Sequence, residues 1–441
     1  MIKHLLSLGG VMRRVLGALI LSLLSTPALA GNVDTFGIGS KATALGGAYS
    51  AYADDPFAVY YNPAGLTQIE RPTVSIGALY LNPHLKVHTY EAVDGDGNRV
   101  EPYGVSFSDT SDNLAVPHLG FATHLFSNLY FGIAAYIPYG LHIKWESDPS
   151  KNPGAYNGFE SYYLRGVITP TLAVKLTDKL SAGLGISFGR SDAGTQRRIY
   201  APSVPSLHNR VIKGELSDDF NVSFNFGLLY KPYDNLSLGI TYRSRTNTDF
   251  EGTVEVVGVD KVHAETSIDH PEQLQFGVKY QPNKRLTLTA DVVWTNWSVV
   301  RGYTVKFDRP LLGKTEEHFP RDWKDTRQIR FGIEYKLNEI VTLRGGYFYD
   351  PSPIPDHTFD MLWPDADKKT YSFGAGFNLF GGRLTVDTVV QYIVAEQKRE
   401  IGGESENLNA SYPGVSGQPG TVSMSADGHL WGYGLTLTYH F

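Results

Sequence analysis

The 441-residue chain contains no cysteine, is low in charged residues at 19%, and has one long hydrophobic run. Without cysteine, an exported protein of this size has no disulfide framework, and backbone hydrogen bonds must supply the equivalent restraint. Acidic residues outnumber basic ones, with a formal charge of −6, which argues against a nucleic-acid partner. The hydrophobic run lies near the amino terminus, so the remaining sequence offers no segment apolar enough for a membrane-spanning helix.

Residues 1–30 have the features of a secretory signal. A basic stretch precedes the apolar run Val15 to Leu24, and Ala28-Leu29-Ala30 supplies the small residues of a cleavage site. We therefore predict that the mature chain begins at Gly31. Every later segment is interpreted as part of an exported protein.

Aromatic residues are abundant, with 27 Tyr, 22 Phe and 6 Trp, and no Pro- or Ser-rich linker divides the chain into domains. Tyr and Trp are typical of surfaces that meet both lipid and its water interface, because each ring carries a polar group. The chain after residue 30 is too long for one ordinary soluble core. One large sheet is the simpler organisation.

The final segment alternates between apolar and polar residues, which predicts a β-strand. One face carries Trp431, Tyr433, Leu435, Leu437, Tyr439 and Phe441, and the other carries Gly432, Gly434, Thr436, Thr438 and His440. The pattern recurs at 274–280, 286–294, 329–337 and 371–379. A soluble sandwich would bury these aromatic faces against a second sheet, whereas a closed barrel satisfies every backbone group within hydrocarbon. We predict an all-β, antiparallel transmembrane β-barrel.

The number of strands follows from the turns between them. Six tight turns are expected at Ser127-Asn128, Thr177-Asp178-Lys179, Pro232 to Asn235, Pro282 to Arg285, Leu337 to Glu339 and Phe380 to Gly382. Seven longer connections are expected near 84–113, 141–160, 191–218, 250–270, 297–325, 351–368 and 398–427. Together they predict a 14-stranded barrel whose two chain ends face the periplasm. The terminal aromatic Phe441 is a candidate signal for a barrel-assembly machine.

A barrel of this size encloses a lumen that side chains alone do not fill. Residues 31–71 precede the first predicted strand, Thr73 to Leu81, and are rich in small, apolar and turn-forming residues. They are too apolar for a free tail, so we predict a plug inside the barrel, with residues 72–441 forming the wall. Within the plug we expect a short helix over Lys41 to Tyr52 and a turn at Asn62 to Gly65.

Specific motifs then point to a family. Ala53-Asp54-Asp55 and Asn62-Pro63-Ala64-Gly65-Leu66 resemble the plug, or hatch, signature of the long-chain fatty-acid outer-membrane transporters, a family that includes channels for aromatic hydrocarbons. Further resemblances follow in the family's order at Arg71-Pro72-Thr73, Tyr139-Gly140-Leu141, Tyr242-Arg243-Ser244, Asp249-Phe250, His270-Pro271-Glu272, Trp294-Thr295-Asn296-Trp297-Ser298, Lys324-Asp325 and Asp350-Pro351-Ser352-Pro353-Ile354-Pro355. This ordered set covers essentially the whole chain after residue 30.

The resemblance implies passive transport by a monomeric barrel in the outer membrane of a Gram-negative bacterium, surrounded by lipid and lipopolysaccharide. A hydrophobic molecule would enter from the outer loops, occupy a pocket inside the barrel and leave sideways where the third strand kinks. The gate and plug residues implied are Asn62, Pro63, Ala64, Gly65, Tyr139 and Gly140. The mature amino end, through Phe36, is expected to reach the pocket and to link ligand binding to opening.

A fatty-acid carboxylate in an apolar lumen requires a cationic partner. The resemblance places Arg197 at the family's pocket arginine, with Arg198 beside it. The family's second basic pocket residue is replaced in this sequence, and Lys314, His318 and Arg321 are the candidates to substitute for it. This departure keeps uncharged aromatic or aliphatic hydrocarbons as an alternative substrate class, because they need no cationic partner.

Two other motifs have simpler interpretations. The segment 185–189 matches the nucleophile elbow of hydrolases around Ser187, which keeps an outer-membrane lipid hydrolase as a remote alternative. It lies inside an alternating strand with no helix after it, so we predict a protein that is not an enzyme. Asp94, Asp96 and Asn98 resemble the start of a calcium loop, but the required glycine and the closing glutamate are replaced. We predict neither a metal site nor a cofactor.

Overall fold

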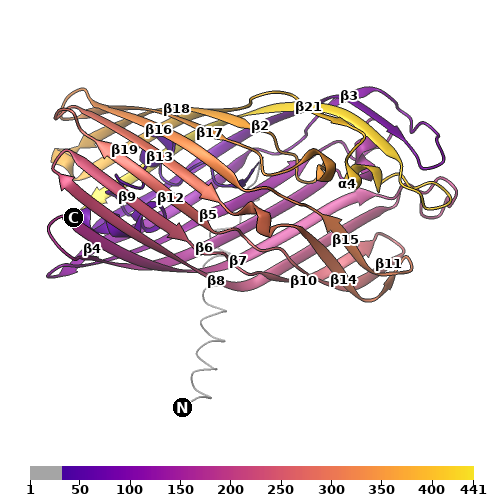
Figure 1. Ribbon diagram of the computed structural model, residues 1–441, viewed down its shortest axis with the longest axis horizontal. Helices are drawn as coiled ribbons and strands as arrows, with labels where there is room; N and C mark the ends of the chain where they lie inside the picture. The colour runs from indigo at the N-terminus through magenta and orange to yellow at the C-terminus, as the bar shows by residue number, and fades with distance from the viewer. Residues whose placement is uncertain (1–31) are drawn as a thin grey trace, which may run out of the picture.

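The computed structural model describes residues 32–441, so the predicted signal and its cleavage site lie outside the described residues. Fourteen antiparallel strands close into a barrel, which confirms the predicted fold class (Figure 1). Around the wall they are β2 (Thr73–Val93), β4 (Leu114–Phe126), β5 (Leu129–Lys144), β6 (Glu160–Lys175), β7 (Leu180–Arg198), β8 (Val211–Tyr233), β9 (Leu236–Arg243), β12 (Gln273–Tyr280), β13 (Leu286–Thr295), β16 (Thr326–Lys336), β17 (Val341–Asp350), β18 (Lys368–Leu379), β19 (Leu384–Ala395) and β21 (Thr421–His440). Each strand pairs with the next, and β21 pairs with β2 to close the ring. Within the described part of the chain, no helix is both long and apolar enough to cross a membrane.

The six predicted tight turns are confirmed. Each one separates two neighbouring strands of the wall, and the turn over Phe380–Gly382 forms a short 3-10 helix, η5. These turns and the carboxyl terminus lie at the left end of the barrel in Figure 1, while the long connections lie at the right end. The two rims are therefore unlike, as the sequence indicated.

The alternating faces are also confirmed. Tyr433, Leu435, Leu437 and Tyr439 of β21 are exposed on the outside of the barrel, and so are the apolar residues of β12, β16 and β18 that share this pattern. Between them, Thr436 and Thr438 face inward and are buried. The outer surface is thus apolar and the inner surface polar, which is the arrangement that a bilayer requires.

Several predicted loop boundaries were wrong, because strands continue beyond the alternating segments. β2 was predicted to end at Leu81 but pairs with β21 as far as Val93, where it lies opposite Thr421. β7 likewise extends through Arg197 and Arg198, which were assigned to a loop. In β7, polar residues occupy both faces of the extension, so the period that identifies a half-buried strand is lost although the hydrogen-bonded ladder continues. In β2, Leu85 and Val87 still alternate with His84 and Lys86, and the alternation was overlooked.

The long connections contain further ordered elements. Two hairpins were assigned to loops, β10 (Asp249–Val256) with β11 (Asp260–Ser267), and β14 (Gly302–Leu311) with β15 (Lys314–Pro320). The other elements are β3 (Val105–Ser108), β20 (Arg399–Gly402), α4 (Glu406–Asn409), η2 (Pro153–Tyr156), η3 (Trp297–Val299) and η4 (Asp356–Thr358). At the right end of Figure 1 they form a folded cap instead of free loops.

The amino-terminal segment lies inside the barrel. It begins with β1 (Asn32–Asp34) and continues through α2 (Ser40–Ala44), α3 (Ala58–Tyr61) and η1 (Pro63–Gln68). The helix predicted over Lys41 to Tyr52 is wrong, since α2 ends at Ala44. Gly46 explains the early end, because its φ of 64° suits glycine and an added Cβ would lie 2.9 Å from the backbone nitrogen of Tyr347 in β17.

Candidate functional site

Residues 35–69, which we call the plug segment, are largely buried within the lumen. Its central residues are almost fully excluded from solvent, including Leu45, Tyr49, Phe57, Tyr61 and Leu66 at 0–1% exposure. Two rings of the segment meet edge to face, with the centroids of Tyr49 and Tyr61 5.3 Å apart. The segment therefore has a packed aromatic core of its own within a polar-walled barrel.

The predicted turn at Asn62 to Gly65 packs against the wall formed by β7 and β8. The side-chain Oδ1 of Asn62 accepts a hydrogen bond from the amide of Ala64 at 3.0 Å, which fixes the turn. Its Nδ2 donates to the carbonyl of Ser50 at 2.7 Å and to the carbonyl of Leu228, in β8, at 2.9 Å. One side chain thus joins two parts of the plug segment to the barrel wall. Near β5, the plug segment instead contributes Tyr60, whose ring lies 5.4 Å from that of Tyr136.

A chain of charged groups joins the plug segment to β16, β17 and β19. Lys41 pairs with Asp54 at 2.6 Å, and the hydroxyl of Tyr52 donates to Glu334 at 2.7 Å. From Glu334 the network continues through Arg344 to Asp387. Burial alone would raise the pKa of Asp54, but the adjacent Lys41 ammonium lowers it to about 2.

The next residue behaves differently. Burial, together with the neighbouring Asp54 carboxylate, raises the pKa of Asp55 to about 6. Asp55 accepts hydrogen bonds from the hydroxyl of Tyr49 at 3.0 Å and from the amide of Phe57 at 2.8 Å. The Asp54-Asp55 pair therefore holds one carboxylate that is firmly ionised and one that is easily protonated.

The ladder between β4 and β5 is interrupted. It begins next to the tight turn and ends where Leu119 faces Ala135, although β4 continues to Leu114 and β5 to Lys144. Beyond Ala135, the edge of β5 that faces β4 has lost its partner strand. On its other edge, β5 loses register with β6 between Tyr136 and Tyr139. The third strand of the wall is thus irregular at the level where the kink was expected.

Strand β1 occupies the free edge of β5. Its backbone pairs with β5 so that Asn32 lies opposite Gly140 and Asp34 opposite Tyr139. The amide of Thr35 then donates to the carbonyl of Pro138 at 3.1 Å. On the inner side, the ring of Tyr139 stacks on His270 with centroids 4.5 Å apart. The amino-terminal segment, rather than β4, fills the interval in the wall.

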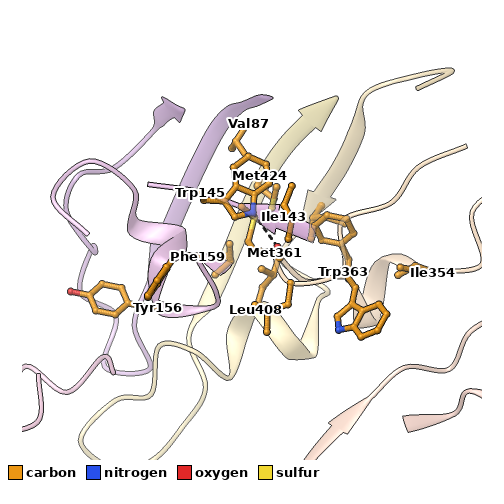
Figure 2. Close-up of a cluster of buried hydrophobic side chains, with 14 of the residues drawn as sticks. Val87, Ile143, Trp145, Tyr156, Phe159, Ile354, Met361, Trp363, Leu408 and Met424 are labelled. Carbon is orange, nitrogen blue, oxygen red and sulfur yellow. Dashed lines mark hydrogen bonds between the residues drawn. The ribbon is translucent and has the colours of Figure 1, made fainter. Parts of the chain in front are cut away.

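An apolar cavity of about 720 Å³, including its open mouth, lies inside the barrel wall. Its apolar lining includes Phe36, Leu85, Val87, Trp145, Phe359, Met361, Ile393, Met424 and Leu430. Figure 2 shows part of this lining, with Val87, Trp145, Met361 and Met424 converging and the indole of Trp145 donating to the carbonyl of Met361 at 3.1 Å. The elements that meet here are β2, β21, the end of β5 and the connection after β17, so the cap forms one wall of the cavity.

Of the predicted ligand-binding residues, Phe36 lines this cavity and the five basic ones are placed elsewhere. Arg197 pairs with Glu317 at 2.9 Å, and Lys314 lies 3.6 Å from the same carboxylate. Arg198 donates to the carbonyls of Ser147 and Asn209, and His318 bonds Thr304. Arg321 is buried and pairs with Asp360 at 2.6 Å.

The basic residues that do line the cavity are Lys368, Arg399 and His429, which sequence reasoning missed. Lys368 lies 2.5 Å from Asp365 and 3.7 Å from Asp350, and Arg399 lies 2.7 Å from Asp356. Both charges are therefore already neutralised. Their positions at the ends of predicted loops gave no signal that they face the lumen.

Comparison with known proteins fits this geometry. A profile of the family described as outer membrane protein transport protein (OMPP1/FadL/TodX) matches residues 21–441. The chain belongs to this family. The predicted resemblance and the outer-membrane location are confirmed, and the barrel is that of an OMPP1/FadL/TodX transport protein.

Similarity to other members of the OMPP1/FadL/TodX family extends over nearly the whole chain. The long-chain fatty acid transport protein of Escherichia coli O6:H1 is 24% identical, with 91% of this chain and 93% of the relative aligned. Outer membrane protein P1 of Haemophilus influenzae is also 24% identical, over 95% and 99%. A solved Pseudomonas aeruginosa FadL homologue shares the fold with a TM-score of 0.78 at 20% identity, covering 94% of this chain and 100% of that one. The Pseudomonas putida toluene transporter TodX has a TM-score of 0.68 at 17% identity, covering 92% and 99%.

The two other motifs singled out in the sequence, around Ser187 and at Asp94, form hydrogen bonds within this OMPP1/FadL/TodX barrel. The hydroxyl of Ser187 hydrogen-bonds that of Thr169 at 2.8 Å, and no histidine of the described chain bonds it. Asp94 caps its own loop and accepts from Tyr200 at 3.0 Å. Among residues 32–441, no cluster of three or more His, Asp and Glu side chains is arranged to hold a metal ion.

Proposed function

We propose that this protein carries long-chain fatty acids, or similar hydrophobic molecules, passively across the outer membrane, with exit between β4 and β5. The proposal rests on the path that the backbone of residues 32–36 takes through the barrel. This short segment occupies the interval beside β5 and then places Phe36 in the apolar cavity. A ligand that displaces Phe36 would therefore act on the same backbone that closes the wall.

The cavity is suited to an apolar ligand. Hydrophobic side chains form most of its surface, as they do in most small-molecule sites. The backbone carbonyl of Phe36 accepts from Gln391 at 3.3 Å, and its ring is buried in an apolar cluster whose packing a ligand would replace. Transport of this kind would need only the concentration gradient of the ligand, because binding and opening would act on the same short segment.

Uncharged hydrocarbons are a second candidate substrate class, and a specific observation favours them. The cationic groups at the cavity are paired with carboxylates, so a neutral molecule meets no unpaired charge. The toluene transporter TodX shares the fold. We propose fatty acids as the main substrates, because two E. coli relatives with near-complete coverage are named fatty-acid transporters.

Uptake measurements separate these classes. In a host that lacks its own transporter of this family, we expect the protein to raise initial uptake of radiolabelled oleate at least tenfold over an empty vector. Toluene uptake is measured in parallel on the same cells. Acceleration of toluene but not oleate would assign the protein to hydrocarbons, and acceleration of neither would contradict the proposal.

We further propose that the barrel acts as a monomer without catalytic activity, surrounded by outer-membrane lipid and lipopolysaccharide. The exposed apolar belt supports contact with lipid all round the wall. At the carboxyl terminus, the ring of Phe441 is 66% exposed and lies 5.0 Å from that of Tyr439. This accessible aromatic pair is suited to recognition by the barrel-assembly machinery.

A further inference from the structure

A second cavity lies on the inner side of the irregular part of β5. It encloses about 420 Å³, including its mouth, and is separate from the apolar cavity described above. Pro138 and Tyr139 of β5 form one side, and Tyr60 of the plug segment forms another. The same two residues of β5 contact the amino-terminal segment, because Pro138 accepts from Thr35 and Tyr139 lies opposite Asp34. This second cavity therefore adjoins the interval that β1 fills.

Arg165, on β6, projects into the second cavity and is buried, with 3% of its surface exposed. Its Nε donates to Oδ1 of Asn221 at 2.9 Å and its Nη2 donates to Oγ of Ser223 at 3.0 Å. Both partners are neutral. Among the side chains of residues 35–441, no carboxylate lies within ion-pair distance of Arg165, although Asp218 is near enough to influence it. Asp218 instead accepts from Asn221 and from the amide of Phe220.

Among the other buried arginines, Arg330 also lacks an ion pair, but it donates to Gln328 and to the carbonyl of Gly47 in the plug segment, so it holds the plug instead of facing the second cavity. The remaining two have carboxylate partners. Arg321 has Asp360 at 2.6 Å, and Arg344 has both Glu334 at 2.8 Å and Asp387 at 2.6 Å. A guanidinium that is removed from water without a carboxylate carries a free-energy cost that neutral hydrogen bonds offset only in part. Within membrane proteins, such a residue marks a pathway for an ion or a charged substrate.

A second guanidinium faces the same space. Arg243 of β9 lines the cavity and lies 4.4 Å from the centroid of the Tyr60 ring. It donates to the carbonyl of Tyr60 at 3.0 Å and to the side chains of Gln273 at 2.9 Å and Gln275 at 3.3 Å. The polar lining also includes Ser187, Ser223, Asn225, Ser244, Thr246 and Gln273. The lining thus combines the guanidinium of Arg165, which has only neutral partners, with hydroxyl groups and the aromatic rings of Tyr60, Tyr136 and Tyr139. This combination suits a molecule with an anionic head and an apolar body.

We propose that Arg165, assisted by Arg243, binds the carboxylate head of a long-chain monocarboxylate as the molecule leaves through the interval between β4 and β5. The proposal rests on the proposed transport function and specifies its substrate class. It assigns the carboxylate to β6 and β9, at the exit, instead of to Arg197 or to the apolar cavity. A neutral hydrocarbon has no group for this site, so the site distinguishes acids from hydrocarbons.

The sharpest test supplies the missing carboxylate from the protein. Ser223→Asp places an acid at the position that already accepts from Arg165, so the arginine becomes internally neutralised and the fold gains an ion pair. We expect initial oleate uptake to fall at least tenfold and toluene uptake to change by less than twofold. Ser223→Asn is the matched uncharged control and retains oleate uptake within threefold.

Removal of the cation gives an independent measurement. We expect Arg165→Gln to lower oleate uptake at least tenfold and Arg165→Lys to retain a third or more. Arg190→Gln is the control, because Arg190 pairs with Asp192 and Asp219 outside this cavity. The heat-modifiable mobility of each barrel in gel electrophoresis reports folding, and uptake is normalised to the folded band.

Three outcomes would overturn the inference. Oleate uptake that survives in both Ser223→Asp and Arg165→Gln would show that the head group does not use this site. Equal loss of oleate and toluene in a folded variant would show a role in general passage. A thermal midpoint of the purified wild type that rises with sodium phosphate but not with sodium decanoate would assign the cavity to an inorganic anion. If cells with the wild-type protein take up no more oleate than the empty-vector cells, the proposed function itself is contradicted. This outcome is distinguished from failure of the site, which is measured only in the variants.

Discussion

Asn62 illustrates how a single side chain holds the plug segment to the wall. It is fully buried, and its amide satisfies one backbone donor and two backbone acceptors. The glycines opposite make room for it, since a Cβ on Gly227 would lie 2.0 Å from Oδ1 of Asn62. The turn itself was predictable, because an asparagine before proline commonly accepts from the amide two residues later. Its barrel partners come from residues more than a hundred positions away and leave no local pattern.

Substitution of Asn62 tests this anchoring. We expect Asn62→Ala to lower the free energy of local opening of the plug segment by about 1–3 kcal/mol, because two buried carbonyls lose their donor. Asn62→Asp is expected to have a larger effect, since a carboxylate would face the carbonyls of Ser50 and Leu228. Hydrogen exchange followed by mass spectrometry checks both, with exchange of residues 58–68 accelerated roughly 5- to 150-fold in the alanine variant.

The control for this measurement is Asn128→Ala, at the tight turn between β4 and β5. Its amide donates to the carbonyl of Lys175 on the exposed rim, far from the turn at Asn62. Exchange of residues 58–68 should be unchanged in this variant. Equal protection in wild type and Asn62→Asp would show that the amide is not the anchor.

At the scale of elements, the plug segment has two differently attached parts. Helix α2 is bound to the wall through Ser40, whose hydroxyl and amide both contact Thr436 of β21 at 2.9 Å. Strand β1 is three residues long and is held by backbone pairing to one edge of β5. A short edge strand with few contacts opens at low cost in free energy. We therefore expect β1 to move during transport and α2 to stay in place.

Engineered disulfides test this difference, and the absence of native cysteine gives a clean background. Asn32 and Gly140 lie directly opposite one another, and such antiparallel pairs have Cα separations that suit a disulfide. We expect oxidised Asn32→Cys/Gly140→Cys to lower oleate uptake at least tenfold, because β1 can no longer leave β5. A reducing agent should restore uptake on the same cells.

The matched control is Ser40→Cys/Thr436→Cys, which links α2 to the wall. Because α2 is not expected to move, oxidation of this pair should leave uptake within twofold of the reduced protein. Loss of uptake in both locked variants would show that the whole plug segment is displaced. Full uptake with β1 locked would rule out exit past β5.

At the scale of the whole molecule, the outer surface of the barrel is apolar and suits lipid, whereas the lumen is polar and accommodates charged side chains. On β16, Phe331 is 50% exposed and Ile333 is 48% exposed, while Arg330 and Glu334 face inward and are buried. Glu334 pairs with Arg344, which also pairs with Asp387, and Arg330 donates to Gln328 and to the carbonyl of Gly47 in the plug segment. Charge is therefore tolerated inside this barrel and costly outside it.

This asymmetry predicts a dependence on depth. Phe331 lies at the middle of β16, so we expect Phe331→Arg to reduce the free energy of unfolding in lipid vesicles by about 2–4 kcal/mol. Leu337→Arg, just beyond the end of the same strand, should cost about 0–1 kcal/mol. Equilibrium denaturation followed by tryptophan fluorescence measures both, and equal costs at the two positions would contradict a membrane centred on β16.

Much of the fold was accessible from the sequence because the signals are local. A period of two marks which side chains face lipid, and a tight turn between two alternating runs fixes where strands begin and end. These signals were enough to predict the fourteen strands and the outward-facing residues of β12, β16, β18 and β21. The hairpins β10–β11 and β14–β15 were missed because they lie within connections that are polar overall, although Val254 and Val256 of β10 do alternate with polar residues.

The candidate site was accessible only in part, because its members are far apart in the chain. Sequence resemblance indicated Phe36 and the region of Tyr139 and Gly140, and these residues do lie at the apolar cavity and beside β1. It did not indicate that Glu317 neutralises Arg197, nor that Arg165 has no carboxylate partner. Such pairings depend on which strands become neighbours when the ring closes.

The chain thus encodes two kinds of information. Alternation, turn residues and the plug motif specify a fourteen-stranded barrel and its family without reference to distant contacts. The interval beside β5, the strand that fills it and the charge state of each lumen arginine arise from long-range packing. The physical reason is that local backbone preferences act over a few residues, whereas burial and ion pairing depend on every group that the closed barrel brings together.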